Sequence, residues 1–389
     1  MKIKTTPMHR AVAGVFLAAA FGSGAVHAGP SIAFGDEGSV TLGYALQVWM
    51  QARGFSSATD SGDSFDTFLR RNRITVSGQY NDLVGFYAQL EAGNDSKFEQ
   101  DNRSVYYRDA YITLDYSDPL RFIVGRFKNT FSRENLEACL EPLTIDRGEV
   151  VAYTPFGGSR DTGVAMWGNL WDAKVQYRLM VSDGREGDAV AKDSPRVTAR
   201  VHWSPLDAEY DYGYRGTYLG TRRVFTLGAA YDYQPDVAYA DFTRRTDSQD
   251  YTGVTADFFY EQPTKSGTYT LSGAYFDYDV GDAINQDPDP SLPVTTELEA
   301  SYVKAAYLLP NKVGIGRLQF YGRFENSEYN LASGFLDQTW AGLGLNYYID
   351  GQNLKVTLEH AQVEFEVQNP ANPSQQDYDQ TTLALQLIF

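Results

Sequence analysis

The amino-acid sequence predicts an all-β protein: a closed antiparallel transmembrane β-barrel of about sixteen strands, with long loops on one side and one long loop folded inward. Three observations predict it. Apolar and polar residues alternate with a period of two along most of the chain. Each alternating segment has the roughly ten residues that a tilted strand needs to cross a bilayer. The connections between segments alternate between short turns and long polar loops.

Residues 1–28 predict a signal peptide that is cleaved. Three cations near the start of the chain precede a short apolar stretch, which ends in Val26-His27-Ala28, with a small residue at the expected cut. Residues 29–389 are then expected to form the mature protein as a single barrel domain. Its one cysteine, Cys139, rules out an intrachain disulfide.

Composition excludes several classes of protein. The chain has 389 residues and a net charge of -17, from 33 Lys and Arg against 50 Asp and Glu. This acidic excess argues against a nucleic-acid-binding protein, which presents a basic face to phosphates. Aromatic residues make up 14% of the chain, too many for a disordered polypeptide. Beyond the N-terminus no run approaches the roughly 18 apolar residues of a membrane helix, so a helical membrane protein is excluded as well.

The strands are predicted from their alternation. In residues 74–80, Ile74, Val76 and Tyr80 are apolar, whereas Thr75 is one of the polar residues between them. About sixteen such segments begin near residues 40, 68, 83, 105, 120, 162, 173, 196, 223, 251, 268, 298, 317, 338, 354 and 379. An even count is typical of a closed bacterial barrel. A soluble β-sandwich would also alternate, but here the apolar face contains many Gly, Ala and Tyr, and the opposite face is rich in ions and Gln, which favours a wet interior.

The connections support the barrel and give it two different ends. Short turns of Gly, Pro, Asn and Asp lie at 81–82, 117–119, 169–172, 263–267, 310–314 and 350–353. Long polar loops lie at 54–67, 93–104, 128–161, 183–195, 233–250, 279–297, 325–337 and 364–378. This arrangement is typical of the bacterial outer membrane, with the short turns in the periplasm. Residues 204–222 are the exception, because they are long where a short turn is expected, and the chain ends in alternating apolar residues closed by Phe389, which resembles the signal of outer-membrane assembly.

If the apolar residues face lipid, the alternate residues face the interior. The basic ones are Arg53, Arg71, Arg73, Arg121, Lys174, Arg178, Arg196, Arg200, Arg317, Arg323 and Lys355. The acidic ones are Glu91, Asp109, Asp115, Asp232, Asp257, Glu325 and Glu359. The inner wall is therefore more basic than acidic, and the acidic excess lies in the loops. Two interpretations stay open: the arginines bind oxyanions in series, or they pair with the wall carboxylates.

The longest loop, residues 128–161, is expected to fold inward and narrow the barrel, because it is too long to stay as a bare external loop. It carries both cations and carboxylates. Cys139 lies in this loop and is interpreted as a small buried apolar residue, with binding of a soft oxyanion as the alternative.

Four motifs carry a family resemblance: Phe68-Leu-Arg-Arg-Asn-Arg73, Arg108-Asp-Ala-Tyr111, Gly125-Arg-Phe-Lys128 followed by Phe131-Ser-Arg-Glu134, and Ser159-Arg-Asp-Thr-Gly-Val164. With these motifs in this order, the chain resembles the phosphate-selective porin O/P family. The resemblance implies a homotrimeric porin in the outer membrane of a Gram-negative bacterium, with basic residues along an anion path. The residues expected to form that path are Arg71, Arg73, Arg121, Arg178 and Arg200 on the wall, with Arg126, Lys128 and Arg133 near the narrowing.

The function expected from these observations is passive diffusion of small anions, phosphate or another oxyanion, through a water-filled channel. The alternatives are a general or cation-preferring porin governed by the acidic loops, or a plugged barrel that binds a partner at the surface. An enzyme is not expected, because the mature chain has only His202 and His360, and neither a serine nor a metal site can be assigned beside them. No cofactor is expected. Expected partners are the anions, outer-membrane lipid, and lipopolysaccharide bridged by divalent cations to the acidic loops.

Overall fold

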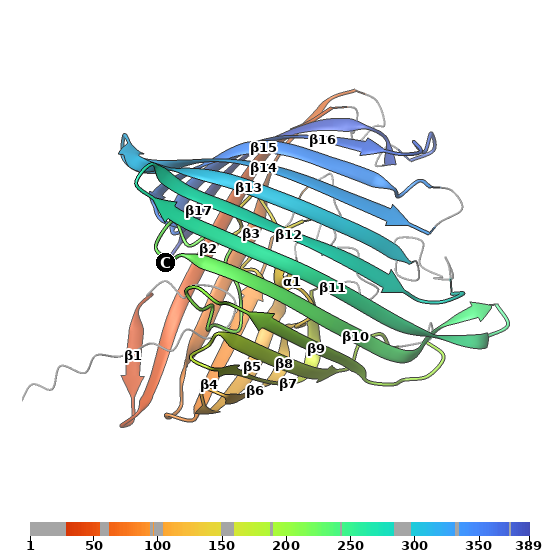
Figure 1. Ribbon diagram of the computed structural model, residues 1–389, viewed down its shortest axis with the longest axis horizontal. Helices are drawn as coiled ribbons and strands as arrows, with labels where there is room; N and C mark the ends of the chain where they lie inside the picture. Colours follow the sequence, from red (N-terminus) through yellow and green to blue (C-terminus); the bar gives the residue numbers. More distant parts are fainter. Residues whose placement is uncertain are drawn as a thin grey trace, which may run out of the picture.

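A computed structural model describes residues 29–54, 62–93, 96, 104–148, 159–186, 190–241, 243–283, 297–330, 334–372 and 375–389. Within these residues, strands β2 to β17 form one closed antiparallel barrel of sixteen strands (Figure 1). The barrel closes where β17 pairs with β2, with Leu385 opposite Val48. The predicted fold class is confirmed. The predicted signal peptide, residues 1–28, lies outside the described residues.

The strands follow one another around the barrel in chain order. Their bounds are β2 (Gly38–Arg53), β3 (Ser64–Gln79), β4 (Val84–Glu91), β5 (Tyr106–Ser117), β6 (Leu120–Lys128), β7 (Arg160–Leu170), β8 (Val175–Ser182), β9 (Arg196–Trp203), β10 (Val224–Asp241), β11 (Thr246–Thr264), β12 (Gly267–Asp279), β13 (Leu298–Val313), β14 (Gly316–Tyr329), β15 (Gln338–Asp350), β16 (Leu354–Phe365) and β17 (Tyr378–Ile388). Strand β1 (Ser31–Phe34) lies outside the barrel and pairs with the start of β2.

The barrel wall has its apolar side chains on the outer face and its polar side chains on the inner face, the reverse of a soluble β-sandwich. On β3, Ile74 is 53% exposed on the outer face, whereas its neighbour Arg73 is only 3% exposed and faces inward. On β8, Leu179 is exposed and Arg178 is buried. Apolar side chains face outward because lipid surrounds a transmembrane barrel, and polar ones face the interior. The soluble-sandwich alternative is therefore wrong.

Short turns end most strands on one side, which we call the short-turn end. In the β3–β4 turn, the Asn81 side chain accepts hydrogen bonds from the backbone N–H groups of Leu83 and Val84, at 3.0 and 2.8 Å. In the β15–β16 turn, Gly351 has a φ of 52°, a left-handed conformation that costs least in glycine. Among the described residues, no helix has the length and hydrophobicity needed to cross a membrane.

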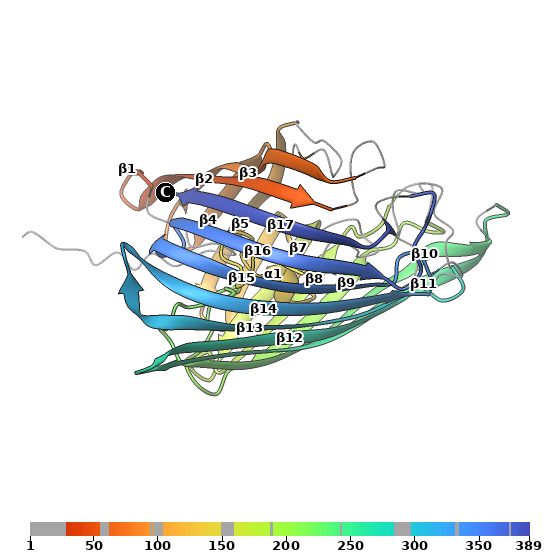
Figure 2. The ribbon, with the colours of Figure 1, turned by 90° about the horizontal axis from the view of Figure 1, so that it is seen from above.

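Two connections occupy the barrel interior from opposite ends. The first is the inner loop, residues 129–148, which follows β6 at the long-loop end and contains the short helix α1 (Arg133–Leu136). In both views α1 lies within the outline of the barrel (Figures 1 and 2). The second is the β9–β10 segment, residues 204–222, which starts at the short-turn end. The prediction that this connection is long is confirmed.

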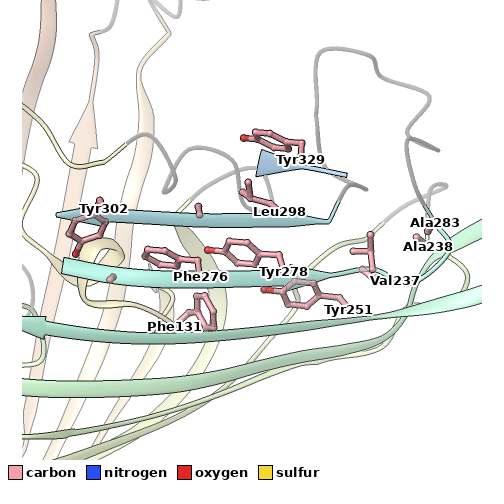
Figure 3. Close-up of a cluster of buried hydrophobic side chains, with 13 residues drawn as sticks. Phe131, Val237, Ala238, Tyr251, Phe276, Tyr278, Ala283, Leu298, Tyr302 and Tyr329 are labelled. Atoms are coloured by element: carbon pink, nitrogen blue, oxygen red, sulfur yellow. The ribbon is translucent and has the colours of Figure 1, made fainter. Parts of the chain in front are cut away.

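Apolar clusters fix the inner loop to the wall at four places, one of them formed by Leu143 with Ala306 and Tyr321. Leu136 packs in a cluster with Phe127 and Trp167 on one wall. Phe131 enters a cluster on β11 to β13, with its ring 5.5 Å from that of Tyr278 (Figure 3). Ile145 packs at the β17–β2 junction. The residues that surround Ile145 there are Trp49, Phe68 and Ala384. The inner loop therefore contacts the wall on several sides of the barrel.

Candidate functional site

The inner face of β3 has two consecutive arginines that point the same way. The β2–β3 register shifts by one residue between Gln47 and Val48: Gln47 lies opposite Arg71, and Val48 lies opposite Leu69, so that Arg70 is the extra residue of a β-bulge. Both guanidinium groups reach Asp146 of the inner loop, at 2.9 Å from Arg70 and 2.6 Å from Arg71. One carboxylate therefore faces two guanidinium groups.

A second bulge repeats this arrangement on β5. Gln89 lies opposite Asp109, and Leu90 lies opposite Tyr107, so Arg108 is the extra residue. Arg108 forms an ion pair with Glu91, whose other oxygen lies 2.8 Å from the Nε of Arg73. Here too, one carboxylate faces two guanidinium groups. We call the inner face of β3 to β5 the basic wall.

The basic wall continues into the inner loop around Cys139. Arg108 Nη2 lies 3.7 Å from the sulfur of Cys139. Burial by itself would raise the pKa of this thiol, but Arg147, Lys128 and Arg108 lie close enough to hold the pKa well below its usual range. Burial would also raise the pKa of Asp146, and Arg71, Arg70 and Arg147 lower it overall. The expected burial of Cys139 is confirmed, but its surroundings are cationic rather than apolar.

The inner face of β8 to β11 pairs its cations differently. Arg200 lies 2.6 Å from Asp257, and both side chains are fully buried. Arg196 contacts two carboxylates, Asp232 and, at 3.6 Å, Asp161. The registers of β8–β9 and β9–β10 run without a break through this region. We call the inner face of β8 to β11 the paired wall.

Two predicted path residues serve as anchors between segments. Lys128 Nζ donates to the backbone carbonyls of Leu136 and Glu137, at 3.3 and 2.5 Å, so it holds the inner loop to the end of β6. Arg133 donates to both carboxylate oxygens of Glu209, each at 2.8 Å. Arg178, a further predicted path residue, is buried on the paired wall.

Arg178 contacts only neutral groups among its described hydrogen-bond partners. It donates to the hydroxyl of Tyr214 and to the carbonyl of Tyr212, both at 2.8 Å, and Nη1 lies 3.5 Å from His202 Nδ1. Tyr212 and Tyr214 belong to the β9–β10 segment. Arg178 therefore fixes that segment to the wall.

The remaining two predicted path residues lie elsewhere. Arg121 lies at the short-turn end, where it pairs with Asp118 at 2.8 Å and stacks on Trp167. Arg126 is exposed on β6 and shares the outer face with Val124, so the expectation that it lines the interior is wrong. The alternation explains this: Phe127 is buried inward, and its neighbour must point outward. The part that the other seven residues play in an anion path stays a prediction.

The sequence analysis did not predict several of the residues that face inward. Arg70 and Arg108 are in β-bulges, which break the alternation and leave no clear mark in the sequence. Lys304 does follow the alternation of β13, between outward Val303 and Ala305, and could have been found. It is buried and lies 2.5 Å from Glu134 of the inner loop. Among the described residues, no three His, Cys, Asp or Glu side chains are arranged to hold a metal ion.

An acidic cavity lies at the long-loop end of β12 to β16, with a volume of about 440 Å³. Carboxylates dominate its lining: Asp277, Asp279, Glu297, Glu299, Glu328, Asp337 and Glu366. Its strand carboxylates, including Glu299 and Glu328, alternate with buried inward residues such as Ala300 and Tyr329, so this cavity lies on the outer face of the barrel.

Comparisons with known proteins agree with this architecture. A family model described as phosphate-selective porin O and P matches residues 42–389. Among solved structures, the outer membrane channel DcaP of Acinetobacter baumannii has 13% identity and a TM-score of 0.59, over 93% of this chain and 100% of that one. An anion-selective porin from Comamonas acidovorans has 10% identity and a TM-score of 0.58, over 91% and 100%.

The trimer form of OmpT from Vibrio cholerae has 12% identity and a TM-score of 0.55, over 91% of this chain and 100% of that one. At such identities the likeness concerns the fold alone. No curated protein sequence matches the chain.

Proposed function

The chain belongs to the phosphate-selective porin O and P family, and from that premise we propose that it conducts small anions, phosphate or another oxyanion, by passive diffusion. It is an outer-membrane channel of a Gram-negative bacterium. The proposed path runs along the basic wall, with no covalent chemistry and no coupling to an energy source. Residues 128–161 are proposed to narrow the channel, although 149–158 lie outside the described residues.

One observation carries this proposal: the two β-bulges of the basic wall. Arg70 and Arg108 are the extra residues, and each shares a carboxylate with a regular wall arginine. Their side chains keep 24% and 16% of their surface exposed, against 5% and 4% for Arg71 and Arg73. A guanidinium group binds a planar or tetrahedral oxyanion through paired N–H donors.

Passage requires binding sites that are weak as well as attractive. A carboxylate shared by two arginines supplies this balance, because it competes with the passing anion for the same donors. Arg71 and Arg73 are held by Asp146 and Glu91, and Arg147 adds a further cation from the inner loop. We therefore propose that an anion moves between neighbouring pairs of arginines and stays bound only briefly at each.

The test is the reversal potential of the purified protein in planar bilayers under a KCl gradient, followed by titration with phosphate. We expect anion preference in the wild type and a conductance that phosphate reduces. The double variant Arg70→Gln/Arg108→Gln should lower the anion preference several-fold and weaken the effect of phosphate. Arg244→Gln is the matched control, because Arg244 is an exposed loop arginine paired with Asp241. Equal selectivity in the double variant and this control would contradict the proposal.

A second candidate function rests on the acidic excess of the chain, 50 Asp and Glu against 33 Lys and Arg. If its carboxylates govern the mouth, the channel prefers cations, and the reversal potential has the opposite sign. Neutralising the exposed long-loop carboxylates Asp63 and Asp282 should then shift the reversal potential, whereas Arg70→Gln should not. We also propose a homotrimer, which native mass spectrometry of the detergent-extracted protein tests.

A further inference from the structure

The β9–β10 segment reaches deep into the barrel, although it connects two strands at the short-turn end. The buried residues of this segment include Glu209, Tyr212, Tyr214 and Thr217. The inner loop enters from the other end, and the two segments meet inside. No part of the proposed anion path accounts for this meeting.

The two segments are joined through their backbones. Ala138 N–H donates to the carbonyl of Tyr214 at 2.9 Å, and Tyr214 N–H donates to the carbonyl of Leu136 at 3.3 Å. Gly216 N–H donates to the carbonyl of Glu141 at 3.0 Å. These bonds form a short parallel ladder between two segments of the chain that enter the barrel from opposite ends.

A buried ion pair reinforces the ladder. Both oxygens of Glu209 accept from the guanidinium of Arg133, and the two side chains are buried. The same carboxylate also accepts from the hydroxyls of Tyr218 at 2.7 Å and Thr226 at 2.6 Å. The pKa of Glu209 stays below its usual range, because Arg133 and these hydroxyls outweigh the effect of burial. Removing one partner of such a pair leaves the other charge buried without compensation.

The segment is in turn fixed to the paired wall. The hydroxyl of Tyr214 lies 2.8 Å from Arg178 Nη1, 3.2 Å from Arg200 Nε and 2.6 Å from His202 Nδ1. The guanidinium of Arg133 also lies over the ring of Tyr214, 4.5 Å from its centroid. Tyr214 thus joins the paired wall to the inner loop.

The fit between the two segments is close. A Cβ atom added to Gly216 would come within 2.2 Å of the backbone nitrogen of Leu143, which no real contact allows. A side chain at this position must displace either the segment or the inner loop. Only glycine lets the two backbones approach so closely.

We propose that the β9–β10 segment is the second half of the constriction: Glu209 and Tyr214 are positioning residues that hold the inner loop, and with it Asp146 and Arg147, against the basic wall. This inference rests on the proposed function only for its effect on selectivity. Its structural part, that the segment holds the loop in place, stands independently. It predicts that a change near the short-turn end alters both loop exposure and conduction.

Cys139 reports on the position of the loop, because it is the only cysteine of the chain and is buried. The experiment measures the rate at which a charged methanethiosulfonate modifies Cys139 in the full-length protein in lipid, together with single-channel conductance. Glu209→Gln should raise the modification rate at least tenfold and change the conductance. Cys139→Ser provides the background rate.

Asp207→Asn is the matched control. Asp207 lies in the same segment, is exposed, and accepts from the backbone of Arg223 rather than contacting the loop. Equal modification rates in Glu209→Gln and Asp207→Asn would overturn the inference. If Glu209→Gln fails to assemble, Gly216→Ala supplies a neutral variant at the same contact, and an unchanged Cys139 rate in it would overturn the inference equally.

The two proposals fail separately. A wild-type channel without anion preference would contradict the proposed function, while the Cys139 rate would still test the role of the segment. An anion-preferring channel whose Cys139 rate is the same in all folded variants would leave the proposed function intact and exclude the β9–β10 segment from the constriction.

Discussion

The basic wall and the paired wall are built from the same residue types and differ in two respects. On the basic wall, Asp146 and Glu91 each face two arginines, and the side chains of the bulge residues Arg70 and Arg108 stay partly exposed. On the paired wall, the β8–β9 and β9–β10 registers are unbroken, and the buried Arg196 and Arg200 each meet one or two carboxylates. The number of inward arginines therefore does not identify an anion path. The two walls differ instead in how many arginines share one carboxylate and in how exposed those arginines are.

The largest expected effect comes from breaking a pair on the paired wall. Arg200→Gln leaves Asp257 buried without its cation, which should lower the free energy of unfolding by about 3–5 kcal/mol. The temperature at which the folded form disappears in heat-modifiability electrophoresis measures this. Arg70→Gln, on the basic wall, should change the free energy of unfolding by about 1 kcal/mol or less, because its side chain is partly solvated. Equal losses in both variants would remove the distinction between the walls.

The next test removes a bulge together with its charge. Deletion of Arg70 should bring β3 into regular pairing with β2 and leave Arg71 opposite Gln47. We expect a folded barrel with anion preference lowered several-fold, as measured by the reversal potential. The substitution Arg70→Gln keeps the bulge but removes the charge, so it separates the effect of the bulge geometry from the effect of the charge. A deletion variant with wild-type selectivity would show that the bulge does not matter.

A pH-dependent effect is expected in the inner loop, which lies between the two walls. Burial and the neighbouring Glu134 raise the pKa of Glu137 to about 7, although Lys304 and Arg133 oppose the rise. Because the folded protein binds this proton more tightly, the contribution to stability is complete below the ordinary carboxyl pKa and is lost as the pH rises through about 7. The loss is at most roughly 3 kcal/mol.

Denaturant unfolding of the wild type between pH 5 and pH 9 measures this loss. Glu137→Gln should flatten the profile, because the amide does not titrate. A wild-type profile that rises with pH across neutrality would contradict the expected sign for Glu137.

The smallest effect is expected at Arg126, which belongs to neither wall. Since it lies on the outer face of β6, Arg126→Gln should leave the reversal potential unchanged and alter the free energy of unfolding by no more than about 1 kcal/mol. The reversal potentials of Arg126→Gln and Arg108→Gln, both recorded in planar bilayers, are compared. A loss of anion preference in Arg126→Gln would return this residue to the path.

The sequence predicts the inward position of Arg71, Arg73, Arg178 and Arg200, because strand alternation is a local property. It does not reveal Arg70 or Arg108, because a bulge depends on the register with a neighbouring strand. The ion-pair partner of Arg133 also cannot be predicted from the sequence. Glu209 lies far along the chain, and only the inward direction of the β9–β10 segment brings the two together. The length of that segment was visible in the sequence, but its direction was not.

Ile145 packs against the first and last strands of the barrel, and this packing has a consequence for assembly. Ile145 contacts the first and last barrel strands and their neighbour through Trp49, Ala384 and Phe68, and Leu140 O accepts from Gln386 of β17. These contacts join parts of the chain that are distant in sequence, and such contacts form late during folding. The inner loop can reach its final position only when β17 has met β2. The inner loop therefore supports the closed seam as well as the interior, because it contacts both of the strands that meet there.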